Sequence, residues 1–75
     1  MPINIRILGL NISYFRKKNR LTQAQLAERV HISVRYLSKI ECGNVTNCAS
    51  LPVLYSIANV LDVTMDELLQ DDISS

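Results

Sequence analysis

Residues 22–41, TQAQLAERVHISVRYLSKIE, have the pattern of two short helices joined by a tight turn. Thr22, followed three residues later by Gln25, forms a capping-box pattern in which each side chain binds a backbone N–H group at the start of a helix. Ser33 can cap the start of the second helix in the same way. The apolar residues of the first helix recur at the spacing of one buried face. They are Leu26, Ala27 and Val30.

The second helix of this segment has two different faces. Leu37 and Ile40 are one turn apart and predict its buried side. Gly43 suits the left-handed residue that follows a helix end. The positions predicted to face outward contain no carboxylate before Glu41 and are Val34, Arg35, Tyr36, Ser38 and Lys39. Two short helices joined in this way form a helix-turn-helix.

The charges of the chain are segregated along the sequence. All eight Lys and Arg residues lie within residues 1–39 with only Glu28 against them, whereas the other six acidic residues follow. A basic half of this kind predicts a polyanionic partner, although segregation for solubility is the alternative reading. No apolar run approaches the ~20 residues of a membrane helix. The apolar N-terminus is interrupted by polar residues and makes a poor signal peptide, so we expect a cytoplasmic protein.

Apolar periodicity predicts three further helices around this segment. Residues 4–19 form the first, and its core stripe is Leu8, Ile12 and Phe15. A second apolar stripe on the same helix consists of Ile3, Ile7, Leu10 and Tyr14. Ser50 is expected to cap the fourth helix, whose predicted core residues are Leu51, Leu54, Ile57, Ala58 and Leu61. A capping box at Thr64 and Glu67 starts a last helix that runs to residue 69 or 70, and residues 70–75 are expected to fray.

The combined pattern resembles the helix-turn-helix domain of the Cro and phage-repressor family, also called the XRE family. The resemblance covers residues 8–69. The residues that carry it are Leu8, Gly9, Ile12, Arg16, Leu21, Thr22, Gln23, Leu26, Ala27, Ile32, Ser33, Ser38, Lys39, Ile40, Glu41, Gly43, Leu54, Ile57, Ala58, Leu61, Asp62, Val63, Asp66, Glu67, Leu68 and Leu69. It implies an all-α, compact five-helix domain of the lambda-repressor type, with the helix-turn-helix at helices 2 and 3. We expect residues 1–75 to form this single domain.

The chain departs from the family pattern at three places. His31 occupies a position where the family often has glycine. The loop after Gly43 is about two residues longer than usual and contains no Lys or Arg, which weakens any phosphate contact there. Asn11 and the apolar N-terminal extension are also outside the common pattern.

The outward face of the second motif helix predicts contact with DNA bases. Side chains near the start of a helix in the major groove can reach base edges. Arg35 can bind guanine O6 and N7 together, Lys39 can bind guanine or phosphate, and Val34 can contact a thymine methyl group. The resemblance implies base-reading roles for the same three positions.

Further residues are expected at the DNA backbone. The resemblance implies that Gln23 binds a phosphate and braces the reading helix. The other candidate backbone contacts are Ser33, Tyr36, Ser38, Lys18 and Asn44. For Tyr36 the alternative is a ring that covers apolar surface with its hydroxyl in water.

The resemblance also implies a structural ion pair. In the family, the arginine at the position of Arg16 pairs with the glutamate at the position of Glu41. Arg16 is therefore expected to support the fold first and to bind DNA second.

Catalytic and metal sites find no support in the sequence. It contains one histidine, no glycine-rich phosphate loop and no nucleophile–base constellation, so we expect no enzyme activity, no cofactor and no small-molecule ligand. Cys42, Cys48 and His31 supply fewer than the four ligands of a structural zinc site, although a redox role for the cysteine pair is possible. A protein-binding module such as an antitoxin or adaptor is the alternative function.

The expected partner is double-stranded DNA, bound as a homodimer. One copy of such a domain contacts about half a site, and related proteins bind pseudo-palindromes with half-sites about one helical turn apart. The sequence offers two surfaces for pairing: the stripe of Ile3, Ile7, Leu10 and Tyr14, and the last helix with Ile73.

Overall fold

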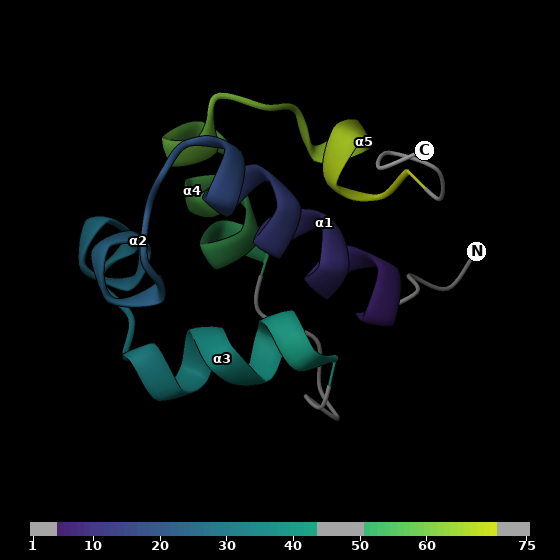
Figure 1. Ribbon diagram of the computed structural model, residues 1–75. Helices are drawn as coiled ribbons and strands as arrows, with labels where there is room; N and C mark the ends of the chain where they lie inside the picture. The colour runs from purple at the N-terminus through teal and green to yellow at the C-terminus, as the bar shows by residue number, and fades with distance from the viewer. Residues whose placement is uncertain (1–4, 44–50, 71–75) are drawn as a thin grey trace.

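Five α-helices surround one apolar core in the computed structural model, which describes residues 5–43 and 51–70. The helices are α1 (Ile5–Lys18), α2 (Gln23–Val30), α3 (Val34–Cys42), α4 (Leu51–Leu61) and α5 (Met65–Leu68). Helix α3 packs on α1 and α2, while α4 packs on α2, α1 and α5. In Figure 1, α3 and α5 lie on opposite sides of α1. None of the helices in the described segments has the length and apolar character needed to cross a membrane.

The ends of α2 and α3 lie where the capping residues predict. The hydroxyl of Thr22 accepts the N–H of Gln25 at 3.1 Å, and the Gln25 side chain accepts the N–H of Thr22 at 2.9 Å. Ser33 accepts the N–H of Tyr36 at 3.0 Å and caps α3. His31 ends α2 with φ 61°, a left-handed conformation that histidine tolerates, and Gly43 ends α3 with φ 70°. These local signals confirm the predicted helix-turn-helix.

The predicted core stripes of α1, α2, α3 and α4 are buried, with one exception. Leu51, which the periodicity assigned to the core, is 68% exposed because it lies at the first turn of α4, beyond the helices that cover the rest of the stripe. The last helix is also shorter than expected, since α5 ends at Leu68. The predictions for Ser50, Cys48, Asn44, Ile3, Ile73 and the frayed end concern positions outside the described residues.

Helices α1 and α3 meet backbone to backbone at Gly9. A Cβ atom at this position would lie 2.6 Å from the carbonyl oxygen of Glu41, and closer still to that of Ile40. Only glycine allows this approach without moving one of the helices. The position of α3 relative to the rest of the domain therefore depends on a missing side chain.

Helix α5 is attached to α1 through Asn11, a residue for which the sequence suggested no role. The Asn11 side chain is buried, and its Nδ2 donates to the carbonyl oxygens of Leu68 and Gln70 at 2.7 Å each. These acceptors lie 57 and 59 residues further along the chain. Asn11 thus provides hydrogen bonds to carbonyl groups that have no partner within so short a helix.

Candidate nucleic-acid interface

Helix α3 separates its side chains into a buried and an exposed face, as the sequence predicts. Leu37 and Ile40 are almost completely buried. Val34 is 44% exposed, and Arg35 and Lys39 are exposed. Arg35 and Lys39 are four residues apart and share one side of the helix. The three predicted base-reading residues are therefore presented together.

The other predicted contacts on this helix differ in their exposure. Ser33 is exposed, and its hydroxyl accepts the Tyr36 N–H while keeping its own proton free to donate. Ser38 is half-buried. Tyr36 is also half-buried and packs against the core, which favours the reading of its ring as a cover for apolar surface.

Arg16, Gln23 and Glu41 are held together by one carboxylate. Arg16 Nε donates to Glu41 Oε2 at 2.8 Å, and Arg16 Nη2 donates to Glu41 Oε1 at 3.1 Å. Gln23 Nε2 donates to the same Oε1 at 3.1 Å. The side chains of Arg16 and Glu41 are 11% and 5% exposed, so the pair expected from the resemblance is present and largely shielded from water.

This network joins three helices at the candidate interface. Arg16 comes from α1, Gln23 begins α2 and Glu41 lies in the last turn of α3. Arg16 also donates through Nη1 to the carbonyl oxygen of Leu21 at 2.8 Å, in the turn before α2. Gln23 Nε2 retains a second hydrogen that can reach an external acceptor. The bond to Glu41, which sequence reasoning did not find, fixes the direction of this amide.

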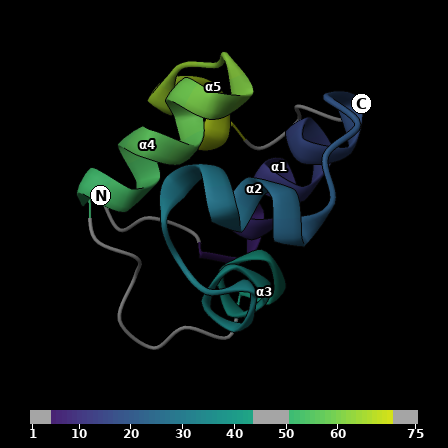
Figure 2. The same cartoon turned by 90° about the vertical axis from the view of Figure 1, so that its left-hand side faces the viewer.

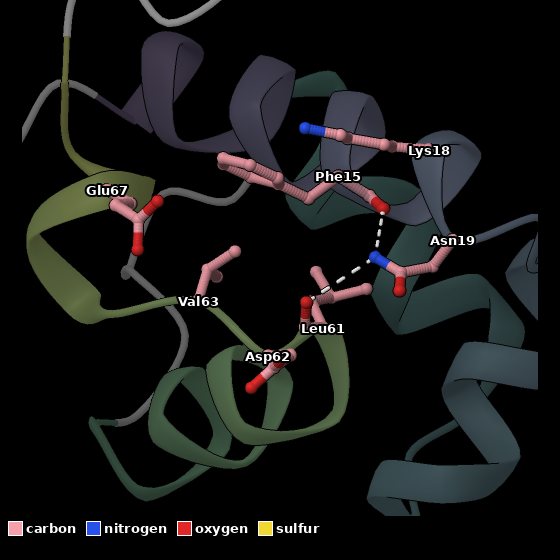
Figure 3. A pocket seen from close by; sticks show the side chains of 7 residues that line it. All are labelled: Phe15, Lys18, Asn19, Leu61, Asp62, Val63 and Glu67. Carbon is pink, nitrogen blue, oxygen red and sulfur yellow. Dashed lines mark hydrogen bonds between the residues drawn. The ribbon is translucent and has the colours of Figure 1, made fainter.

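Lys18 lies apart from the other candidates. It follows Arg16 by two residues, which places it about 200° around α1 from the side that meets α3. There it lines a pocket of about 320 Å³ between α1, the end of α4 and α5, and Figure 3 shows its side chain beside this pocket. Its ammonium group lies 6.0 Å from the centre of the Tyr14 ring. The structure does not bring Lys18 together with α3, and Asn44 is outside the described residues.

No side chains that could hold a metal ion gather in the described part of the chain. Cys42 is an exposed free thiol at the end of α3. What the arrangement can do is present a guanidinium, an ammonium and an isopropyl group on a convex helix. The acidic group nearest to them, Glu41, is turned inward and neutralised by Arg16.

The chain matches the sequence model of the HTH_3 helix-turn-helix family over residues 12–68. It belongs to this helix-turn-helix family. The family assignment and the all-helical fold expected from the sequence are thereby confirmed. The five helices and the exposed outer face of α3 are how this member of the HTH_3 family builds the motif.

Two curated relatives come from Bacillus subtilis. The HTH-type transcriptional regulator SinR is 34% identical over 65 residues, which are 87% of this chain and 58% of the relative. The uncharacterized HTH-type transcriptional regulator YazB is 39% identical over 62 residues, which are 83% of this chain and 87% of the relative. The HTH_3 chain described here therefore spans little more than half the length of SinR.

A solved structure of SinR in complex with DNA has the same fold. It superposes with a TM-score of 0.77 at 35% identity, covering 84% of this chain and 98% of the other. The similarity of this HTH_3 chain to SinR is thus one of fold and sequence together.

Proposed function

We propose that this protein is a sequence-specific DNA-binding transcriptional regulator that inserts α3 into the major groove. The observation that carries the proposal is the outer face of α3, where Val34, Arg35 and Lys39 are exposed together above a buried Leu37 and Ile40. A duplex major groove admits one α-helix and offers guanine acceptors and thymine methyl groups to these side chain types. The DNA complex of the similar protein SinR supports the same mode of binding.

Gln23 has the second role in this proposal. It lies at the start of α2, and its amide is directed by Glu41 at the end of α3. A phosphate bound by the free N–H of Gln23 would therefore be held in a fixed relation to the bases read by α3. Contacts of this kind set the register of a protein on the duplex without reading its sequence.

We further propose that two copies bind a pseudo-palindromic operator and repress transcription. One α3 reaches about half a site, and a twofold pair doubles the contacts with the same residues. A repressor needs only to occupy its operator, which is the action that the exposed face of α3 supports.

Selection of bound sequences from random duplex DNA tests the proposal. We expect one enriched motif with inverted symmetry, and an affinity that falls linearly with salt on logarithmic axes, because lysine and arginine contacts release counterions. Salt-dependent binding without an enriched motif would contradict a regulator that reads sequence. An enriched motif without symmetry would contradict the pairing of two copies.

Arg35→Ala should weaken binding to the selected site by about 1–3 kcal/mol and relax the preference at one base pair of each half-site, because it removes the bidentate contact to guanine. Competition binding against single-base variants of the site measures both effects. Arg29→Ala is the matched control, since Arg29 is exposed on α2, away from the outer face of α3. It removes the same charge and should leave the base preference unchanged. An Arg35→Ala protein that still selects the same motif would show that Arg35 does not read a base.

A further inference from the structure

Two apolar surfaces remain exposed in the described part of the chain. The α1 patch consists of Leu10 and Tyr14, which are 66% and 39% exposed. The α4 patch consists of Leu51, Pro52, Tyr55 and Met65. Helix α5, which the sequence offered as a possible cover for the α1 stripe, contacts α1 through Asn11 and leaves Leu10 and Tyr14 accessible. Exposed apolar surface of this kind marks a candidate partner site.

The α4 patch is both a projection and a groove. Leu51 and Tyr55 are one turn apart on α4 and are 68% and 61% exposed. With Pro52 and Met65 they border a groove of about 450 Å³ without polar lining atoms. A twofold pair uses the same surface on both partners, so it needs a surface that can offer a side chain and also receive one. The α4 patch has both parts.

Charge distinguishes the two patches as sites for a second copy. Among the helices of residues 5–43 and 51–70, α4 alone contains no Lys, Arg, Asp or Glu. Charges close to a twofold axis face their own copies, and like charges brought together cost free energy. Helix α4 can approach its symmetry mate without that cost.

The α1 patch lacks this property. Its helix also contains Arg6, Lys17 and Lys18, all exposed, and the Lys18 ammonium lies near the Tyr14 ring. Pairing through α1 would place two sets of cations against each other. These charges make the α1 patch unsuitable for self-association.

The position of α4 also suits two reading helices on one DNA duplex. Figure 2 shows α3 at the foot of the domain and α4 on its left flank, with α1 behind on the other side. A twofold axis beside α4 and perpendicular to the DNA keeps α3 of both copies on the same side. A twofold pair through this flank therefore leaves both outer faces of α3 free.

We infer that the α4 patch is the surface through which two copies of this chain pair on DNA. The inference rests on the proposed function, because it identifies the contact that a pseudo-palindromic operator requires. The patch is small beside the ~800 Å² that each partner buries in a standard interface. The pair should therefore be weak in solution and form chiefly on the operator, where both copies are held close together.

Tyr55→Glu in the full chain tests the inference. The variant should keep its helical circular dichroism, because Tyr55 is 61% exposed. Its affinity for a half-site should equal that of the unmodified protein, whereas its affinity for the full palindrome should fall on the order of 100-fold with the loss of cooperative binding. Quantitative gel shifts on half-site and full-site duplexes, with sedimentation of the free protein, measure these quantities.

Leu10→Glu is the matched control, since it places the same charge on an equally exposed leucine of the α1 patch. It should keep cooperative binding. A mixture of Tyr55→Glu and Tyr55→Lys should restore cooperativity that neither variant has alone, because opposite charges then meet across the pair. Cooperative binding by Tyr55→Glu, or loss of cooperativity only in Leu10→Glu, would overturn the inference. An unmodified protein that fails to bind a half-site would instead contradict the proposed function.

Discussion

Replacing Glu41 with alanine should lower the free energy of unfolding by about 3–5 kcal/mol, because it leaves the shielded guanidinium of Arg16 without a counter-charge. The carboxylate accepts three hydrogen bonds, two from Arg16 and one from Gln23, so its loss also frees the start of α2. Against a total stability of typically 5–15 kcal/mol for a protein of ordinary size, this loss is large. Urea denaturation followed by circular dichroism measures it.

Two companion proteins give this result its meaning. Glu28→Ala removes an exposed carboxylate from α2 and should change stability by no more than about 0.5 kcal/mol. Replacing the pair together, with Arg16→Met and Glu41→Leu, should recover much of the loss, because no buried charge remains unpaired. A Glu41→Ala protein as stable as Glu28→Ala would show that water screens the pair despite its low exposure.

Gly9→Ala should destabilise the protein by about 3 kcal/mol, although alanine normally favours a helix over glycine by up to 1 kcal/mol. The new Cβ would meet the backbone oxygens of Ile40 and Glu41, which cannot turn aside as a flexible side chain would. Helices α1 and α3 must then separate, so DNA affinity should fall together with stability. Urea denaturation and gel shifts on the selected operator follow the two effects.

The reverse exchange at an exposed helical position calibrates this experiment. Ala24 is exposed in α2, and Ala24→Gly should cost about 0.5–1 kcal/mol from backbone entropy alone. If Gly9→Ala instead raised stability by a similar amount, the close approach of α1 and α3 would not exist in solution.

The features that the sequence predicted correctly depend on neighbouring residues. The capping boxes at Thr22 and Thr64 and the left-handed helix end at His31 involve partners within a few positions, so the local pattern contains the whole interaction. Buried stripes are equally local, because helical periodicity decides which residues share a face. The location of α3 and the identity of its exposed residues could therefore be predicted.

The features that the sequence did not reveal involve contacts between distant segments. The carbonyl acceptors of Asn11 come from α5, and the bond from Gln23 to Glu41 joins the start of α2 to the end of α3. Leu51 followed the core spacing but lies where α4 extends past its neighbours. Lys18 is close to the DNA-binding motif in sequence, yet the helical rotation from Arg16 turns it towards α5. Periodicity gives the face of a helix and not what lies opposite that face.

The acidic end of the molecule is separated from its reading helix by the whole core. Asp66 and Glu67 belong to α5, which Figure 1 places on the far side of α1 from α3. The domain measures 30 × 26 × 19 Å, whereas electrostatic potentials decay over ~8–10 Å at ordinary ionic strength. A phosphate at α3 therefore experiences the nearby cations and almost nothing of the distant carboxylates. The chain can remain near electrical neutrality, with a net charge of +1, and still attract a polyanion from one direction only.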